Sequence, residues 1–144
     1  MAARNGNLGY NYYTVVLTEE SKNTLLELCK DKNICSGVFE CVKKVYCDHC
    51  TIMHNSNHNP YVKEYLDIQL GKEFTMEVVA IGYNFNAMAA RLSRGWYITQ
   101  LCTNNIPHIT IGTFEGGKPV DSNFIDFWGG LETPVILKGI LKRL

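Results

Sequence analysis

The chain has 144 residues and no formal net charge, because 14 lysine and arginine side chains balance 14 aspartate and glutamate side chains. This length is typical of one domain with a substantial hydrophobic core, and the balanced charge does not favour strong non-specific binding to long nucleic acid. No apolar run approaches the ~20 residues of a membrane-spanning helix, and residues 1–7 lack the apolar core of a secretory signal. Six cysteines without such a signal indicate reduced thiols. We therefore expect one cytoplasmic domain over residues 1–144, with no membrane partner.

The first third of the chain predicts a strand, a helix and a second strand. Residues 12–17 are aromatic and β-branched, as is typical of strands. Thr18 then fits a helix N-cap, and Glu19 and Glu20 suit the positive end of the helix dipole. The next strand is expected over residues 45–53.

The middle of the chain predicts a helix followed by a strand pair. Pro60 suits the first position of a helix, and Gly71 suits its end. Residues 74–83 and 87–92 have the composition of strands with a turn between them. Residues 95–101 are expected to be a further extended piece.

The last third predicts a strand over residues 106–112, a short helix and a closing strand over residues 134–141. The short helix is expected to begin at Asp121 or Ser122 and to run through Trp128. Strands and helices interleave with irregular crossovers along the whole chain. This pattern predicts an α+β fold with a mostly antiparallel sheet.

One pattern, His-x-Thr, occurs twice within the predicted strands. His49 and Thr51 form the first copy, and His108 and Thr110 form the second. Side chains two residues apart on a strand point to the same face, so each copy presents an imidazole and a hydroxyl together. If the two strands are neighbours, the four polar groups converge on one patch.

That set of groups suits the cleavage of a phosphodiester without a metal. Two imidazoles can divide the work near neutral pH, one as a base and one as an acid, because an unperturbed imidazole titrates near pH ~6.5. Threonine hydroxyls can hydrogen-bond the non-bridging phosphate oxygens, whose charge rises in the transition state. The bare pattern also fits two hydrogen-bonded histidines on half-buried strands, and this alternative stays open.

The chain resembles the 2H phosphoesterases, a family named for two His-x-Thr or His-x-Ser motifs. Residues 105–113 resemble the strand that carries the second motif in that family. Lys118-Pro119 and Ser122-Asn123 resemble the segment that follows it in the tRNA-ligase-like branch. Residues 77–83 and 87–90 resemble the strand pair between the two motifs.

The resemblance implies a fold, a chemistry and four site residues. The implied fold is two-lobed and pseudo-symmetric α+β, with antiparallel sheets forming a central cleft and helices outside. His49 and His108 are implied to be the catalytic acid–base pair, and Thr51 and Thr110 to hold the phosphate. No metal or other cofactor is implied, and the choice of acid and base between the histidines stays open.

Because the chain resembles the stand-alone viral members of that family, we expect a phosphodiesterase that opens a cyclic dinucleotide or oligonucleotide. The expected substrate is an immune second messenger such as cyclic GMP-AMP, cleaved in the host cytosol for immune evasion. One alternative substrate is an RNA 2′,3′-cyclic phosphate, and another is a 2′–5′ oligoadenylate. Short RNA is a possible partner, and no obligate protein partner is inferred. A non-catalytic module that binds nucleotides or RNA is the alternative of another class.

Three further residues are candidates for substrate binding. Tyr12 and Trp128 are the preferred platforms for base stacking, with Tyr10 and Trp96 as further candidates. Lys118 is a candidate for contact with a phosphate. Core packing is the alternative for each aromatic residue, and simple exposure to solvent is the alternative for the lysine.

A zinc site is the competing interpretation of the first motif's surroundings. Cys47, Cys50, His54 and His58 have the order of a zinc-ligand set. However, the two cysteines lie on opposite faces of the expected strand, and the two ligand pairs are closer in sequence than in most zinc fingers. Metal ligation by these residues is therefore the minor alternative.

Overall fold

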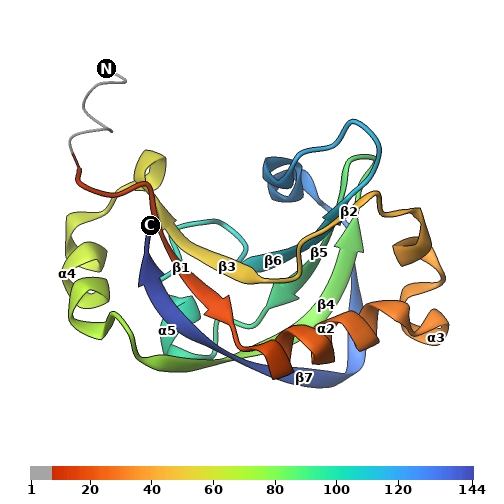
Figure 1. Ribbon diagram of the computed structural model, residues 1–144, viewed down its shortest axis with the longest axis horizontal. Coiled ribbons are helices and arrows are strands. Elements are labelled where there is room, and N and C mark those ends of the chain that lie inside the picture. Colours follow the sequence, from red (N-terminus) through yellow and green to blue (C-terminus); the bar gives the residue numbers. More distant parts are fainter. Residues whose placement is uncertain (1–7) are drawn as a thin grey trace.

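The computed structural model describes residues 8–144, and six strands in it form a closed antiparallel barrel. Around the barrel the strands follow the order β6, β3, β1, β7, β4 and β5, and β5 pairs back onto β6 (Figure 1). A short strand, β2 (Lys44–Val45), pairs with the end of β6. The barrel strands are β1 (Tyr12–Leu17), β3 (His49–His54), β4 (Glu73–Tyr83), β5 (Ala87–Leu92), β6 (His108–Thr113) and β7 (Trp128–Arg143).

The prediction of a two-lobed α+β fold around a central cleft is wrong. The β5–β6 pairing, from Ala87 opposite Thr113 to Arg91 opposite His108, joins the two edges of the sheet. At the other side of the barrel, β7 is 16 residues long and pairs with both β1 and β4. Ladder hydrogen bonds therefore continue around the whole circuit, and no gap separates two lobes.

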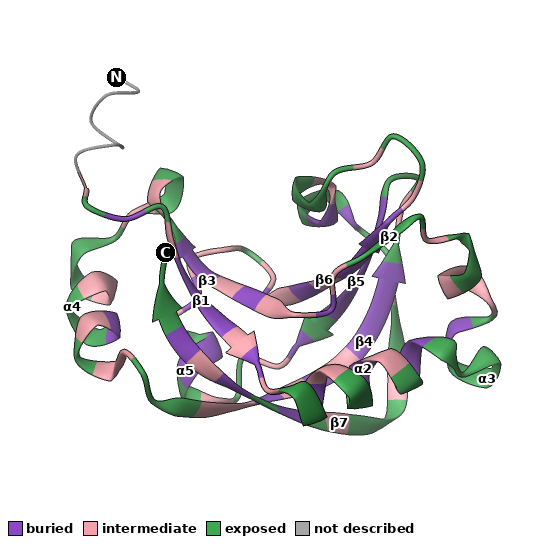
Figure 2. Ribbon diagram, viewed as in Figure 1, coloured by how far each residue is buried: buried purple, intermediate pink, exposed green. Residues whose placement is uncertain are grey.

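Alternate residues of the strands form the hydrophobic core together with buried side chains of the helices. Tyr13 and Val15 of β1, Ile109 of β6 and Leu137 of β7 are fully buried, and so is Met76 of β4 (Figure 2). Complete burial of such a side chain contributes ~1.5–3 kcal/mol to folding, so the core holds the strands in register. The faces opposite the core are free to carry polar groups.

Two longer helices pack outside the barrel. The first, α2 (Glu19–Lys30), begins as predicted at Thr18, whose side chain accepts a hydrogen bond from the Ser21 amide. The second, α4 (Pro60–Gln69), begins at Pro60 as predicted. Asp67 of α4 holds that helix against the barrel by accepting hydrogen bonds from Tyr13 and Arg143. Within residues 8–144, no helix is both long and apolar enough to cross a bilayer.

The remaining elements are short helices in the connections. They are α3 (Lys32–Cys35), η1 (Val38–Cys41), η2 (Asn55–Asn57), α5 (Tyr97–Gln100) and η3 (Pro119–Phe124).

Several local predictions need correction. Residues 45–53 are not one strand, because Cys47 has a φ of +54° and β3 begins only at His49. Residues 97–100 form α5 instead of an extended piece, because the Thr99 hydroxyl donates to nearby backbone carbonyls and closes a turn. The predicted helix through Trp128 ends at Phe124, and Trp128 itself starts β7.

Candidate active site

The β3–β6 pairing brings the two His-x-Thr motifs together. Cys50 of β3 lies opposite Ile109 of β6, and both side chains are fully buried in the core. In an antiparallel pair this register places His49 opposite Thr110 and Thr51 opposite His108. The four polar side chains therefore share the face away from the core, where all four are half-buried.

His49 is oriented by its neighbour in sequence. Its Nδ1 lies 2.8 Å from a carboxylate oxygen of Asp48, which is itself half-exposed. Because an ionised carboxylate only accepts hydrogen bonds, the hydrogen sits on Nδ1 of the ring. The other ring nitrogen, Nε2, is left for a substrate.

His108 is oriented by a backbone group. Its Nδ1 donates to the carbonyl of Ile106 over 2.9 Å, so Nε2 carries the lone pair of the neutral ring. Burial lowers the pKa of His108, the bond to Ile106 opposes that shift, and the charge of His49 lowers the pKa further. His108 is therefore held in its neutral form near pH 7.

The second threonine is tied to η3. Its hydroxyl oxygen lies 3.0 Å from the Ser122 hydroxyl oxygen, and Ser122 is only 2% exposed. This bond crosses from β6 to the 3₁₀ helix that covers it. Thr110 is thereby positioned without losing its capacity to bond a ligand, since a hydroxyl both donates and accepts.

A cation also lies on this face. Arg91 of β5 is opposite His108 in the β5–β6 pair, so the two side chains leave the sheet on the same side. Arg91 is exposed, and it forms no ion pair with the residues that the structure describes. Arg91 therefore places a cation on the face that carries the second motif.

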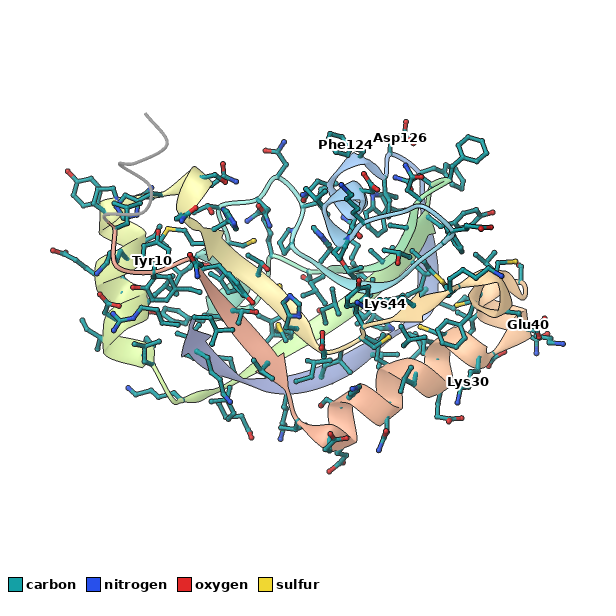
Figure 3. The ribbon with its side chains drawn as sticks, turned by 45° about the horizontal axis from the view of Figure 1, so that its top comes forward. Tyr10, Lys30, Glu40, Lys44, Phe124 and Asp126 are labelled. Carbon is teal, nitrogen blue, oxygen red and sulfur yellow. The ribbon has the colours of Figure 1, made fainter. Side chains whose placement is uncertain are left out.

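A pocket of about 430 Å³ opens beside His108. Trp128 lines it, and the indole Nε1 is buried with no hydrogen-bond partner among residues 8–144. Phe124 also lines it and is 71% exposed, projecting outward from η3 (Figure 3). The other lining residues are mostly small and polar: Asn57, Thr103, Asn104, Asn105, Ile106, Ser122, Asn123 and Ile125.

The loop that forms one wall of this pocket is held by Arg94. Its guanidinium donates to the backbone carbonyls of Thr99, Cys102, Asn104 and Asn105. These bonds satisfy carbonyls that no strand would pair. The segment that leads into His108 is therefore fixed in shape.

The predicted binding residues fall in different places. The Tyr12 ring lies 6.3 Å from the His49 ring and is stacked on His54, so Tyr12 adjoins the first motif. Trp128 lines the His108 pocket, whereas Lys118 lines a separate pocket at the end of β6. Tyr10 and Trp96 do not line the His108 pocket, and each has a protein partner, His58 and Glu77 respectively.

The residues of the zinc alternative are not gathered. Cys47 and Cys50 are both buried and donate to the backbone carbonyls of Ile111 and Thr51. His54 bonds Ser56, and His58 bonds Tyr10. No group of three or more potential metal ligands exists within the described chain from residue 8 onward.

Sequence reasoning missed three members of this surface. Asp48 was available as the residue before the first motif, and Ser122 as part of the Ser-Asn pair after the second. Arg91 has no local signal, because only the β5–β6 register puts it beside His108. The asparagines of the pocket come from η2, from the loop before β6 and from η3, so no single segment reveals them.

No protein-family model matches the chain, and no curated protein matches it. Among solved structures, the chain is similar to a fungal RNA kinase with a TM-score of 0.64 and 16% sequence identity. The chain shares its fold with part of that kinase. The match covers 92% of this chain but only 44% of the kinase, so the chain spans less than half of the length of that protein. At this identity the likeness extends to the fold alone.

Proposed function

We propose that the chain is a metal-independent phosphodiesterase in which His49 and His108 are the acid–base pair. The observation that carries the proposal is the β3–β6 register, which puts both motifs on one face. On each ring Nδ1 is engaged by the protein, by Asp48 or by Ile106, and Nε2 is left for the substrate. Two imidazoles with free Nε2 atoms on one surface supply both proton transfers that phosphodiester cleavage needs.

The environments of the two rings favour one division of labour. His108 is the base, because burial keeps its ring neutral and Nε2 has a lone pair. It takes the proton of the attacking hydroxyl or water while that oxygen forms its bond to phosphorus. His49 is then left as the acid: Asp48 accepts the Nδ1 hydrogen, and Nε2 is the ring atom that passes a proton to the leaving oxygen. The bond from phosphorus to the leaving oxygen breaks as His49 protonates that oxygen.

The hydroxyls and the arginine bind the phosphate in this proposal. Thr51 and Thr110 flank the histidines and donate to the non-bridging oxygens. Arg91 reaches the same oxygens from β5 and offsets the charge that they gain in the transition state. Tyr12 lies beside His49 and is the candidate for stacking on the leaving group.

The substrate class in this proposal is a short RNA or a small nucleotide. The pocket beside His108 supports it, because Trp128 and Phe124 offer aromatic surface and the asparagines offer both donors and acceptors to a base edge. The solved protein with a similar fold is an RNA kinase, so RNA substrates, such as an RNA 2′,3′-cyclic phosphate, are the first to test. Cyclic dinucleotides such as cyclic GMP-AMP, with a role in viral immune evasion, and 2′–5′ oligoadenylate stay predictions from the sequence.

A substrate panel in excess EDTA tests the proposal. Cyclic-phosphate-ended RNA, cyclic dinucleotides and 2′–5′ oligoadenylate are incubated with the wild type and with His49→Ala and His108→Ala. We expect cleavage of at least one substrate and a loss of ~10²–10⁴-fold in each variant. His58→Gln is the matched control, since His58 lies outside both motifs and contacts Tyr10, which does not line the His108 pocket. Full activity in both alanine variants would refute the assignment.

The same panel separates an enzyme from a binding module. A silent binding protein would hold one of these ligands tightly and release it unchanged after long incubation. An enzyme would return a changed product, either a hydrolysed phosphate or a cyclic phosphate formed by transesterification, which is separated from the substrate by chromatography and identified by mass. Recovery of intact ligand from the wild type in every arm would overturn the proposed activity.

A further inference from the structure

Three lysines from distant parts of the sequence line one pocket. Lys43 and Lys44 come from β2 and the residue before it, and Lys118 comes from the turn that precedes η3. The pocket has a volume of about 690 Å³ and lies at the end of β6, next to Thr113 (Figure 3, where Lys44 is labelled). In the sequence, Lys43 and Lys44 are simply two neighbouring basic residues. The fold instead combines them with Lys118.

The backbone that carries Lys43 and Lys44 is fixed by ladder bonds. The Lys43 amide donates to the Thr113 carbonyl over 2.9 Å, and the Tyr46 amide donates to the Ile111 carbonyl over 2.8 Å. The Lys44 ammonium also lies 5.1 Å from the centre of the Tyr46 ring, a cation–π contact at the pocket wall. The two lysines are therefore presented to the pocket by an ordered strand.

The backbone that carries Lys118 is held by a tight turn. Gly117 approaches the Asn86 carbonyl so closely that an added Cβ would lie 2.0 Å from the oxygen. The Lys118 amide donates to an Asp121 carboxylate oxygen over 2.9 Å. Both walls of the pocket are thus set by backbone contacts, and only the lysine side chains need to adjust to a ligand.

The pocket has an excess of positive charge. Three ammonium groups face one carboxylate, Glu115, among the residues that line it. None of the three lysines forms an ion pair with another residue in the described part of the chain. Because the whole chain has no net charge, this is a local concentration of cations and not a general property of the surface.

The pocket lies farther along β6 than the proposed phosphate site. Thr113 follows Thr110 by three residues on β6, which is ~10 Å along an extended strand. The segment 118–122 connects the same two places, since Lys118 lines the pocket and Ser122 bonds Thr110. An anion in the lysine pocket is therefore separated from a phosphate at Thr110 by more than the size of one phosphate group.

We propose that the lysine pocket is a second phosphate subsite, which binds a phosphate of the substrate beyond the one that is cleaved. The inference rests on the proposed phosphodiesterase function. It specifies the substrate as an oligonucleotide with at least one phosphate besides the one that is cleaved. A mononucleotide leaves this pocket empty. The two sites together select length through charge, because each phosphate contact adds a favourable electrostatic interaction.

Kinetics on two substrates test the subsite. They are adenosine 2′,3′-cyclic phosphate and a triadenylate that ends in the same cyclic phosphate. The triple variant Lys43→Ala/Lys44→Ala/Lys118→Ala should raise KM for the triadenylate at least ~10-fold and leave the mononucleotide unchanged. Lys72→Ala/Lys138→Ala/Lys142→Ala, three exposed lysines elsewhere, is the matched control. Equal KM values for the triadenylate in both triple variants would overturn the inference.

A binding measurement separates failure of the subsite from failure of the proposed function. Fluorescence anisotropy of a labelled triadenylate is recorded with His49→Ala/His108→Ala protein, so that no turnover is needed. Introducing the three lysine substitutions into this protein should weaken binding of the triadenylate. It should also reduce the slope of the logarithm of the binding constant against the logarithm of the salt concentration by ~0.7, the value for one phosphate contact on a single strand. If binding weakens in this way but the wild type cleaves no substrate, the subsite is supported and the proposed activity is rejected. An unchanged slope and affinity would reject the subsite whatever the activity.

Discussion

Thr110 and Ser122 share a hydrogen bond of 3.0 Å between their hydroxyl oxygens, and this bond ties the second His-x-Thr strand to η3. It fixes the rotamer of a side chain that is proposed to bind phosphate. Ser122 itself is only 2% exposed, and its hydroxyl is engaged with Thr110. Its expected role is to position Thr110.

Replacement of Ser122 by alanine tests that role. We expect kcat/KM to fall by up to ~10-fold, because one net hydrogen bond contributes ~0.5–1.5 kcal/mol. Steady-state kinetics give the effect, and thermal unfolding shows how much of it is loss of fold. Thr24→Ala, which removes a hydroxyl-to-carbonyl bond on α2, is the control and should not change kcat/KM. A Ser122→Ala enzyme with wild-type kinetics would contradict the positioning role.

The low pKa of His108 makes both activity and stability depend on pH. Burial lowers this pKa from the ordinary value of 6.5, so the folded protein resists protonation that the unfolded chain accepts. As pH falls below ~6.5, the unfolded chain binds a proton at His108 that the folded protein does not yet bind. The free energy of unfolding therefore decreases until the pH passes the pKa of His108 in the folded protein. Above pH ~6.5 this stabilising contribution is fully present.

Urea unfolding at pH 5.5 and 7.5 measures that dependence, and His108→Asn should reduce the difference between the two pH values. In kinetics, the acid limb of the kcat/KM profile should have its midpoint below 6.5, because His108 must be neutral to act as the base. A midpoint above 6.5 would assign the base role to another group.

Asp48 is expected to position His49 through the 2.8 Å contact at Nδ1. Asp48→Ala should lower kcat by about 10-fold or more, since a hydrogen bond with a charged partner contributes ~1.5–3 kcal/mol. Asp48→Asn retains an acceptor oxygen and should recover part of that loss. Equal losses in the two variants would show that the hydrogen bond does not matter for the reaction.

Arg91 is expected to bind the phosphate from β5, opposite His108. Arg91→Ala should raise KM by ~10-fold or more at low salt, and Arg91→Lys should restore the charge without the bidentate geometry. Because the effect is electrostatic, it should shrink as salt rises. Lys72→Ala is the control, because it removes one exposed cation elsewhere on the surface. If Lys72→Ala raises KM as much as Arg91→Ala does, Arg91 has no specific role.

The local elements could be predicted from the sequence because their signals are local. The aromatic and β-branched run at residues 12–17 gave the bounds of β1, and the composition of residues 87–92 gave those of β5. Thr18 and Pro60 mark the starts of α2 and α4 through capping chemistry that involves only neighbouring residues. The shared face of each His-x-Thr pair also follows from alternation along a strand, and the catalytic roles of the four residues stay predictions.

The sequence by itself determined which residues form the strands and which polar pairs share a face, because both depend on contacts within a few residues. Only the tertiary structure decided that β5 pairs with β6 and closes the barrel, since strand partners and register depend on residues far apart in the chain. The same non-local pairing put Arg91 beside His108, and packing of η3 put Ser122 against Thr110. It also brought Lys118 into one pocket with Lys43 and Lys44, although Lys44 lies seventy-four residues earlier in the sequence.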